Sequence, residues 1–511
     1  MILQYTIDLK LINFKLIMDI NKNIFLTTAI SYTNGPPHIG HLYEIVLADF
    51  VKRWFKLLNY NILLMTGTDE HGQKIEKTAN DQNIKPIDLC NQNSELFKNL
   101  ANKLNVQYDH FIRTTDSNHI EHVKKLFEIS QLNGNIYLGK YSGLYLPREE
   151  RFITEKEANE TNGLDPVTGI PYIYYEEESY FFRLSEYIEY IKTHISNNII
   201  IPCDEKINLE HRLNNGLDDL SITRTSFKWG IPINDDHVIY VWFDALLNYY
   251  TGLMTFNESF DRKTINLIGK DILWFHAVIY PAILKSVNLE KYVPENILVH
   301  GFITDENGQK MSKSLGNVIL PDELFNEFSI ESIRFYLIWE TEWNKDVKFN
   351  KNRLKEIYNN ILIKSYGNLV QRIYCLMYKE LNKLNGYTLE MLQQNSLKKY
   401  IIENANKYYH KFDHKLYDIY NYKREIEEDL KNINTYLTDQ KPWLDTDEIV
   451  KYEKITKTFI NVLNVSKKLW PIIPNKIEEI YLLFGLELTI DNYNLNNLNL
   501  TKANVKIFIP L

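Results

Sequence analysis

Residues 24–65 read IFLTTAISYTNGPPHIGHLYEIVLADFVKRWFKLLNYNILLM, and this stretch decides the fold. Its first seven residues are mostly apolar and β-branched, which predicts a buried strand at 24–30. After the break at NGPP, apolar residues recur at spacings of three and four from His38, which predicts a helix. A second strand is predicted at 61–65 (NILLM). This β-α-β order implies a parallel sheet that binds ligands at the carboxyl ends of its strands.

The rest of the chain changes character along its length. Residues 131–205 are rich in turns and aromatic residues, and we interpret them as a small mixed insertion. Parallel-sheet character is predicted to return in VIYVWFDALLNYY (residues 238–250) and TINLIGKDILWFHAVIYPAIL (residues 264–284). From about residue 350 the sequence is typical of long, lysine-rich amphipathic helices with little glycine. The predicted fold class is therefore α/β with a small mixed insertion, followed by an all-α domain.

The composition limits the class of protein. The chain has 511 residues, a formal net charge of −8, 44% hydrophobic and 24% charged residues. This balance is ordinary for a globular protein, and no apolar run approaches the roughly 20 residues of a membrane span. Three scattered cysteines, Cys90, Cys203 and Cys375, disfavour a disulfide scaffold and fit a reducing compartment. The acidic total argues against a general basic coat for nucleic acid but allows a local basic path.

The string HIGH, residues 38–41, begins the first predicted helix. Its two histidines lie on one face near the helix N-terminus, where backbone N–H groups and the helix dipole favour an anion. Imidazole N–H groups can add hydrogen bonds to charge that develops on a phosphate, and Gly40 leaves room for a flat base to approach the backbone. A metal-binding pair or two ordinary surface histidines are the alternatives for this pattern.

A second motif, GQKMSKSLGN at residues 308–317, combines two glycines, two lysines and two hydroxyl side chains. A loop of this kind can close on a polyphosphate. The ammonium groups of Lys310 and Lys313 then neutralise charge as the leaving group departs. Taken alone, the motif is equally compatible with a solvated basic loop.

Together, HIGH after a first strand and KMSKS near the end of the α/β region resemble the two signatures of the class I aminoacyl-tRNA synthetases. From about Asn23 to the C-terminus, the chain resembles the methionyl-tRNA synthetase family within that class. The stretches that carry this resemblance are TTAISYTNGPPHIGHL, TGTDEHGQKI, EEESYFFRLS, LSITRTSFKWGIPI, YVWFDALLNYY, GKDILWFHAVIYPA and GQKMSKSLGNV.

The resemblance implies a methionine–tRNA ligase that works in two steps. It activates L-methionine with ATP, accompanied by Mg²⁺, to methionyl-adenylate and pyrophosphate. It then transfers methionine to the 3′-terminal adenosine of tRNA(Met), both initiator and elongator. Neither step needs a protein nucleophile, since the enzyme must hold the reactants in line and stabilise phosphoryl charge. A site rich in His, Lys and Gly, without a Ser/His/Asp triad, fits this chemistry.

The resemblance also implies a domain order. Residues 1–17 have neither arginine nor a small-residue cleavage site, so they do not read as a signal or transit peptide, and we expect an N-terminal extension with Met18 a plausible initiator. The other expected parts are a Rossmann-like catalytic domain in two halves at 18–130 and 206–300, a connective insertion at 131–205, a KMSKS and stem-contact region at 301–349, and a helical anticodon-binding domain at 350–511.

For ATP, the resemblance implies contacts from both motifs and from the GKD string. The implied ATP-binding residues are His38, Gly40, His41, Glu44, Gly269, Asp271 and Lys313, and the implied catalytic residues are His38, His41, Lys310 and Lys313. Gly269 and Asp271 should hold the ribose, since a carboxylate accepts hydrogen bonds from sugar hydroxyls. The alternative for Asp271 is a helix cap, because it precedes the apolar stretch ILWFHAV.

Methionine presents an ammonium group and a thioether. Asp69, in TGTDEHG, follows a strand and supplies a carboxylate for the ammonium group. The thioether needs a soft aromatic pocket, because sulfur packs well against rings. By resemblance, the pocket positions are Ala29, Ile30, Tyr32, Trp242, Ala245, Tyr249, Ile272 and His276. Trp242 and Tyr249 alone would read as core aromatics, and His71 and Arg224 match the family without a role that chemistry assigns.

Three residues of the helical region match the family's anticodon readers. Asn368 and Arg372 lie four residues apart and so share one helix face, and Trp443 follows a proline just before a helix. By resemblance they read the CAU anticodon through hydrogen bonding and stacking of splayed bases. A polar i,i+4 pair and a staple-like tryptophan are the alternatives.

The sequence departs from the family in its insertion and at its end. The segment GKYSGLYLPREERFITEKE (residues 139–157) has no cysteine, and a total of three cysteines forbids a four-thiolate site. We therefore expect no structural zinc and no metal-binding residues. The sequence ends at VKIFIPL, and we expect no C-terminal oligonucleotide-binding dimerisation domain. A cytoplasmic monomer without a membrane partner is the expectation.

Three other functions compete with this interpretation. Sibling synthetases for Leu, Ile or Val usually carry a large editing insertion, for which the space before Lys310 looks too small, and the Cys enzyme uses an active-site zinc that these cysteines cannot supply. A small-molecule nucleotidyltransferase using HxGH leaves KMSKS and the helical domain unexplained. A tRNA-binding paralogue without catalysis is opposed by the intact His38, His41, Asp69 and Lys313.

Overall fold

The computed structural model describes residues 23–146, 151–153, 155–166, 168–256, 262–311, 316–381, 396–408, 418–488, 495–500 and 507–508. These residues form two compact units, each assembled from several segments. The first unit draws on the described parts of Met1–Pro37, Leu63–Leu100 and Tyr108–Val299, and the second on those of His38–Ile62, Ala101–Gln107 and His300–Leu511. The expected extension at 1–17 and the candidate initiator Met18 lie outside the described residues.

A parallel sheet is the centre of the α/β part. In the described residues it has seven strands in the order β2-β3-β1-β12-β13-β8, with β4 paired to β3. Its strands are β1 (Asn23–Thr28), β2 (Ser31–Tyr32), β3 (Asn61–Asp69), β4 (His110–Arg113), β8 (Ile199–Ile201), β12 (Lys263–Gly269) and β13 (Asn296–His300). The pairs β1–β12, β2–β3, β3–β4 and β13–β8 all run parallel. The β-α-β interpretation of the opening stretch is confirmed, since helix α2 (Ile39–Leu57) separates β1 from β3 along the chain.

The limits of the first two predicted strands shift slightly. β1 ends at Thr28 rather than at residue 30, and β3 continues to Asp69 rather than stopping at residue 65. The strand β3 is buried over almost its whole length, because a parallel strand is covered on both faces. The extra residues of β3 carry the chain to Asp69, which ends the strand.

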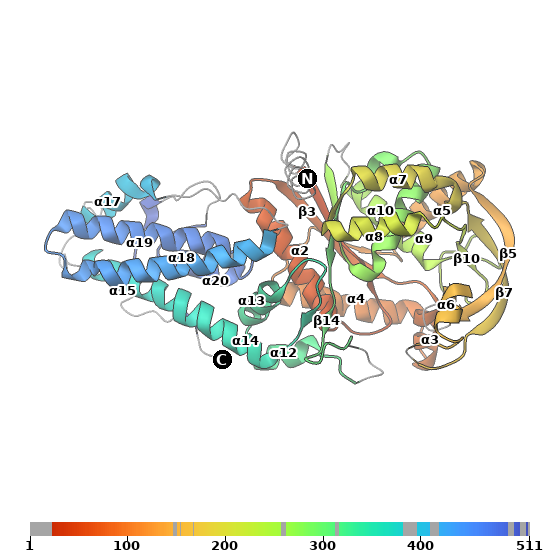
Figure 1. Ribbon diagram of the computed structural model, residues 1–511, viewed down its shortest axis with the longest axis horizontal. Coiled ribbons are helices and arrows are strands. Elements are labelled where there is room, and N and C mark those ends of the chain that lie inside the picture. Colours follow the sequence, from red (N-terminus) through yellow and green to blue (C-terminus); the bar gives the residue numbers. More distant parts are fainter. Residues whose placement is uncertain are drawn as a thin grey trace. The chain divides into compact units, whose positions relative to one another are not determined.

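The region predicted as a small mixed insertion, residues 131–205, contributes three strands to an antiparallel sheet in the order β6-β5-β7-β9, whose last strand lies after residue 205. Its strands are β5 (Ile136–Leu146), β6 (Arg151–Ile153), β7 (Ile173–Phe182) and β9 (Leu220–Ser221). The long hairpin-like pair of β5 and β7 stands out in Figure 1. Besides α2 and the helices between residues 241 and 279, the α/β part contains α3 (Gln73–Asp81), α4 (Pro86–Lys103), α5 (Ser117–Leu132), α6 (Glu155–Glu160), η1 (Leu184–Tyr187), α7 (Ile188–Asn197), α8 (Cys203–Leu213), α11 (Tyr280–Ser286) and η4 (Glu290–Tyr292).

One predicted element is wrong. In VIYVWFDALLNYY, only β11 (Val238–Ile239) is extended, and it pairs antiparallel with β10 (Thr223–Arg224). The rest of that stretch forms the helices α9 (Val241–Leu246) and α10 (Asn248–Thr255). A short apolar run does not distinguish a buried strand from a buried helix by periodicity, which is why the prediction fails here. In the second stretch, residues 264–269 do lie in the parallel sheet as β12.

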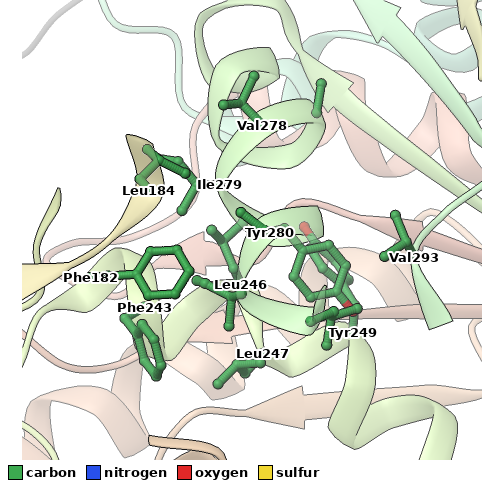
Figure 2. Packing of buried hydrophobic residues seen from close by; sticks show 14 of the residues in the cluster. Phe182, Leu184, Phe243, Leu246, Leu247, Tyr249, Val278, Ile279, Tyr280 and Val293 are labelled. Carbon is green, nitrogen blue, oxygen red and sulfur yellow. The ribbon is translucent and has the colours of Figure 1, made fainter. Parts of the chain in front are cut away.

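The core of the first unit joins the sheet to these helices. Figure 2 shows part of it, with Phe182 and Phe243 beside Leu246 and with the rings of Tyr249 and Tyr280 close together. The centroids of those two tyrosine rings are 5.6 Å apart in an edge-to-face arrangement, which aromatic quadrupoles favour. Residues of the candidate methionine pocket therefore belong to the packed core of this unit.

The C-terminal part of the second unit is helical, as predicted. Its helices are α12 (Pro321–Glu327), α13 (Ile330–Glu340), α14 (Lys351–Ile357), η6 (Tyr358–Gly367), α15 (Asn368–Leu381), α17 (Ser396–Asn404), η7 (Ala405–Lys407), α18 (Ile419–Gln440), η9 (Pro442–Leu444), α19 (Glu448–Leu469), α20 (Pro474–Leu483) and η10 (Leu495–Asn497). The long helices α18 and α19 pack side by side (Figure 1). The short strands β14 (Ile303–Thr304) and β15 (Val347–Lys348) pair in parallel in the same unit. None of the helices among the described residues is long and apolar enough to cross a membrane.

A buried charge network ties α2 to the helical part of the second unit. Oδ2 of Asp49 lies 2.6 Å from Nη2 of Arg334 and 2.8 Å from Nε of Arg53. Arg334 also donates to the carbonyl oxygens of Leu104 and Ile472. Burial alone would raise the pKa of Asp49, but the two guanidinium groups outweigh it and hold the pKa below its usual value.

Replacing Asp49 should therefore be costly. Asp49→Asn would leave two buried guanidinium groups without their anion, and we expect a loss of about 3–5 kcal/mol in the free energy of unfolding. The measurement is the urea midpoint of the variant against the unmodified chain. The control is Asp322→Asn, because Asp322 pairs with Lys103 at 3.3 Å on the surface, where a pair contributes about 0–1 kcal/mol. Equal shifts in the two variants would contradict the structural role of Asp49.

Candidate active site

The two histidines of HIGH build the start of α2. The N–H of His38 donates to Nδ1 of His41 at 3.1 Å, and the N–H of Gly40 donates to Nδ1 of His38 at 3.1 Å. The rings stack with their centroids 3.9 Å apart and their planes 21° apart. This is a capping box in which imidazole nitrogens replace the usual hydroxyl and carboxylate oxygens.

These capping bonds decide which nitrogen of each ring carries a proton. A backbone N–H can only donate, so Nδ1 of His38 and Nδ1 of His41 must both accept. The proton of each neutral ring then lies on Nε2, which is the form that donates to a phosphate oxygen. A metal-binding pair is disfavoured, because in this form Nδ1 already accepts a hydrogen bond and Nε2 carries the proton, so neither nitrogen has a lone pair for a metal.

The contacts of Gly40 and Ile39 indicate which groups at the start of α2 are suited to bind an anion. A Cβ atom at Gly40 would lie 2.9 Å from Cε1 of His38, so the glycine lets that ring approach the backbone. The N–H of Ile39 donates to the carbonyl oxygen of Ile319, beyond the lysine motif. The first N–H groups of the helix thus already have protein acceptors, and the imidazole N–H groups are the donors suited to an anion here.

The other described nucleotide candidates of the second unit are Glu44 on α2 and Lys310, the first residue of KMSKS. Oε2 of Glu44 is 3.2 Å from Nε2 of His300, so this carboxylate has a protein partner. Nζ of Lys310 lies 4.2 Å from the centroid of the Phe302 ring, a cation–π contact. Lys313 lies outside the described residues.

Gly269 and Asp271 follow the carboxyl end of β12 in the first unit. Gly269 is the cap position of the short turn η2 (Lys270–Ile272), and Asp271 lies inside that turn with its side chain exposed. The alternative of a helix-capping Asp271 therefore does not describe this turn. An exposed carboxylate at the carboxyl end of a parallel strand is well suited to accept from ribose hydroxyls.

Tyr249 and His276 form the polar end of the candidate methionine pocket. Nδ1 of His276 donates to the carbonyl oxygen of Ile272 at 2.9 Å, so Nε2 accepts from the hydroxyl of Tyr249 at 2.7 Å. His276 lies in the π-helical turn η3 (Phe275–Ile279), a deviation that often marks functional sites. Burial lowers the pKa of His276 to about 4, so the ring is neutral at physiological pH.

The remaining pocket candidates border the same core. The Trp242 ring stacks on Phe275 with centroids 3.7 Å apart, and it is half-buried rather than an ordinary core aromatic. Ala29, Ile30 and Ile272 pack against the core from partly buried positions, and Ala245 is buried. Tyr32 and Asp69 are register partners in β2 and β3, so they lie side by side at the end of these strands. Asp69 is only 7% exposed, which is an apt place to bind a substrate ammonium group.

A buried network behind His71 escapes the sequence analysis. Asp244 is fully buried, and its carboxylate contacts Nδ1 of His71 at 2.6 Å and Nε2 of His119 at 2.8 Å. Burial alone would raise the pKa of Asp244, but the two histidines bring it below its usual value. The hydroxyl of Tyr32 donates to the carbonyl oxygen of His71, which joins this network to the pocket candidates. The only sequence signal is a charged residue inside the apolar stretch VWFDAL.

The anticodon candidates lie on helices of the second unit. Asn368 and Arg372 are exposed on α15, and Nη2 of Arg372 donates to the hydroxyl of Thr438 near the end of α18. Trp443 follows shortly after, in the turn η9, and is 46% exposed. The cap of α19 is Asp447, so Trp443 does not occupy the position of a hydrophobic staple.

The protonation of His276 predicts a pH dependence of stability. The unfolded chain protonates this side chain near pH 6.5 and the folded chain only near pH 4. Its contribution to the free energy of unfolding is therefore constant above pH 6.5 and falls as the pH drops from 6.5 to 4, by roughly 3 kcal/mol in all. The urea midpoint of His276→Gln should lose this part of the pH dependence. His211→Gln, at an exposed helix position, should keep it, and identical pH profiles for all three proteins would refute the assignment.

Comparison with known proteins places the chain in a family. The family described as "tRNA synthetases class I (M)" matches residues 24–169 and 162–374. The methionine–tRNA ligase of Ureaplasma parvum is 34% identical over 94% of this chain and 97% of its own length. That of Mycobacterium bovis is 40% identical over 71% of each chain. A structure of Mycobacterium tuberculosis methionyl-tRNA synthetase bound by methionyl-adenylate matches at a TM-score of 0.80 and 31% identity, over 95% of this chain and 100% of that one, which confirms the predicted fold class. The chain therefore belongs to the methionyl-tRNA synthetases of class I, the methionine–tRNA ligases.

Proposed function

We propose which side chains of this methionine–tRNA ligase bind ATP, methionine and tRNA. The observation that carries the proposal is the start of α2, where capping bonds keep the proton of His38 and His41 on Nε2. Two stacked neutral imidazoles that donate in this way suit the α-phosphate region of ATP, where charge develops as methionine carboxylate attacks and pyrophosphate leaves.

The other ATP contacts follow from charge and position. Glu44 and Gly40 belong to the same helix start, and Gly269 with Asp271 should bind the ribose. Lys310 and Lys313 should neutralise the departing pyrophosphate, because ammonium groups stabilise charge that develops on a leaving group. ATP is a substrate, and the chain's part is to orient it and to donate hydrogen bonds.

Methionine should bind through Asp69 at its ammonium group and through the aromatic shell at its thioether. Trp242, Tyr249 and His276 supply soft apolar surface, and the His276 ring is neutral, so it adds no charge beside the sulfur. Tyr32, Ala29, Ile30, Ala245 and Ile272 complete the proposed pocket. A neutral lining of this kind favours a thioether over a charged side chain of similar length.

For metals we propose Mg²⁺ with ATP and no structural zinc. Among the described residues, no three His, Cys, Asp or Glu side chains come together as a metal site. Mg²⁺ usually binds through substrate phosphate oxygens and water with only one or two carboxylates, so the phosphates of ATP should hold most of it. Burial raises the pKa of Cys90 to about 12, and its thiol bonds to the carbonyl oxygen of Glu70, which opposes a zinc thiolate there.

The macromolecular partner should be tRNA(Met), initiator and elongator alike, since both present the same CAU anticodon. Asn368 and Arg372 provide hydrogen-bonding groups on one helix face, and Trp443 provides an exposed ring on which a splayed base can stack. We also propose that the protein acts as a monomer in the cytoplasm.

The role of His41 can be tested by separating its two nitrogens. His41→Asn keeps an acceptor near the Nδ1 position, which preserves the cap, but removes the Nε2–H donor. We expect methionine-dependent ATP–pyrophosphate exchange to fall by about 10²–10³-fold, the usual cost of removing one donor to a developing oxyanion. His41→Gln, which keeps a donor near Nε2 and loses the cap acceptor, should retain more activity.

Lys313→Ala should also lose exchange strongly, and leucine should not replace methionine in any variant.

The role of Trp443 can be tested separately from catalysis. Trp443→Ala should lower kcat/KM for tRNA(Met) in aminoacylation by about 10- to 100-fold, because stacking of one base contributes about 1–3 kcal/mol. ATP–pyrophosphate exchange without tRNA should be unchanged. Leu444→Ala is the matched control, since Leu444 is the next residue and is 67% exposed. A similar loss in both variants would argue against base stacking on Trp443.

A further inference from the structure

Asp305 organises the turn that leads into the lysine motif. It follows β14, and its Oδ1 accepts hydrogen bonds from the N–H groups of Asn307 at 3.0 Å and Gln309 at 2.9 Å. Its backbone N–H donates to the carbonyl oxygen of Gln309, and its carbonyl oxygen accepts from Gly308. Gly308 has a φ of +82°, a conformation that favours glycine. The carboxylate therefore closes a tight turn from 305 to 309.

The second oxygen of the same carboxylate reaches the far side of the motif. Oδ2 of Asp305 accepts from Nδ2 of Asn317 at 3.0 Å. Asn317 lies after the KMSKS string, and two residues later the carbonyl oxygen of Ile319 accepts from the N–H of Ile39 at the start of α2. One side chain thus binds the chain both before Lys310 and after the KMSKS string.

The position of Lys310 depends on this turn. Lys310 forms an antiparallel bridge with Thr304, which closes the turn that Asp305 caps. Its ammonium group lies over the Phe302 ring, on the strand side of the same turn. The hydrogen bond from Asn317, and then those from the turn, hold the pKa of Asp305 below its usual value, so the acceptor is ionised at neutral pH.

We propose that Asp305 is a positioning residue for the activation step: it clasps Gln309 and Asn317, and so sets where the chain that carries the motif lysines begins and ends. The inference rests on the proposed role of Lys310 and Lys313 in neutralising pyrophosphate. Asp305 acts through these lysines and does not itself contact ATP, since a carboxylate beside a triphosphate would be repelled. Without the clasp, the motif lysines would be misplaced in the transition state of activation. Misplaced lysines should lower the reaction rate more than they weaken the binding of methionine.

The test is methionine-dependent ATP–pyrophosphate exchange with the full chain. Asp305→Ala should lower kcat/KM for ATP by about tenfold, with the KM for methionine unchanged. Asn317→Asp should be equally impaired, because two carboxylates then face each other. The double variant D305N/N317D should recover most of the activity, since the amide at 305 accepts from the turn N–H groups and donates to the carboxylate at 317.

Glu306→Ala is the matched control. Glu306 is the next residue and is exposed, so the change removes the same charge from the same turn without touching the clasp. It should exchange like the unmodified chain. Unchanged exchange in Asp305→Ala, an equal loss in Glu306→Ala, or no recovery in the double variant would each overturn the clasp.

The same assay distinguishes a failure of the Asp305 clasp from a failure of the role proposed for Lys310 and Lys313. If Lys313→Ala loses exchange while Asp305→Ala does not, only the clasp fails. If Lys313→Ala and Lys310→Ala both exchange normally, the proposed role of the lysines fails, and the clasp fails with it as a positioning device.

Discussion

The second unit depends on one buried carboxylate. Asp49 lies in the middle of α2 and is shared by Arg53 on the same helix and Arg334 on α13. Arg334 in turn donates to the carbonyl oxygen of Ile472, which lies between helices α19 and α20 in the sequence. Removing one partner of a buried ion network leaves the others uncompensated, so α2, α13 and the segment at Ile472 depend on the same carboxylate. The HIGH histidines lie at the N-terminus of this helix.

Neutral imidazoles are the common theme of both candidate binding regions. At His38 and His41, backbone N–H groups donate to Nδ1, whereas at His276 the Nδ1–H donates to a carbonyl oxygen. The hydrogen bond made by one ring nitrogen therefore decides what the other can do, donating from Nε2 in the first case and accepting at Nε2 in the second. In the function that we propose, the same residue type donates to a phosphate at one place and lines an apolar pocket at another, because its local partners differ.

Much of the fold could be predicted from local patterns. The strand, helix and strand of residues 24–65 and the helical C-terminal part follow from apolar periodicity, which reflects burial along one element. The helices at 241–255 could not be predicted in this way, because a run of apolar residues that is buried on most sides shows no helical or strand periodicity. The cluster of Asp244 with His71 and His119 was also invisible, since its members are far apart in sequence.

The sequence by itself determined the family and the chemical character of the site, since HIGH, KMSKS and the residues between them are short, ordered strings whose side-chain chemistry is local. The tertiary structure decided the surroundings of individual side chains. Burial in the folded core lowers the pKa of His276, and folding brings Asn317 to 3.0 Å from Asp305, within the distance at which hydrogen bonds are strong. Burial shifts the pKa of a side chain in this way because a charged form that loses its surrounding water becomes less favourable.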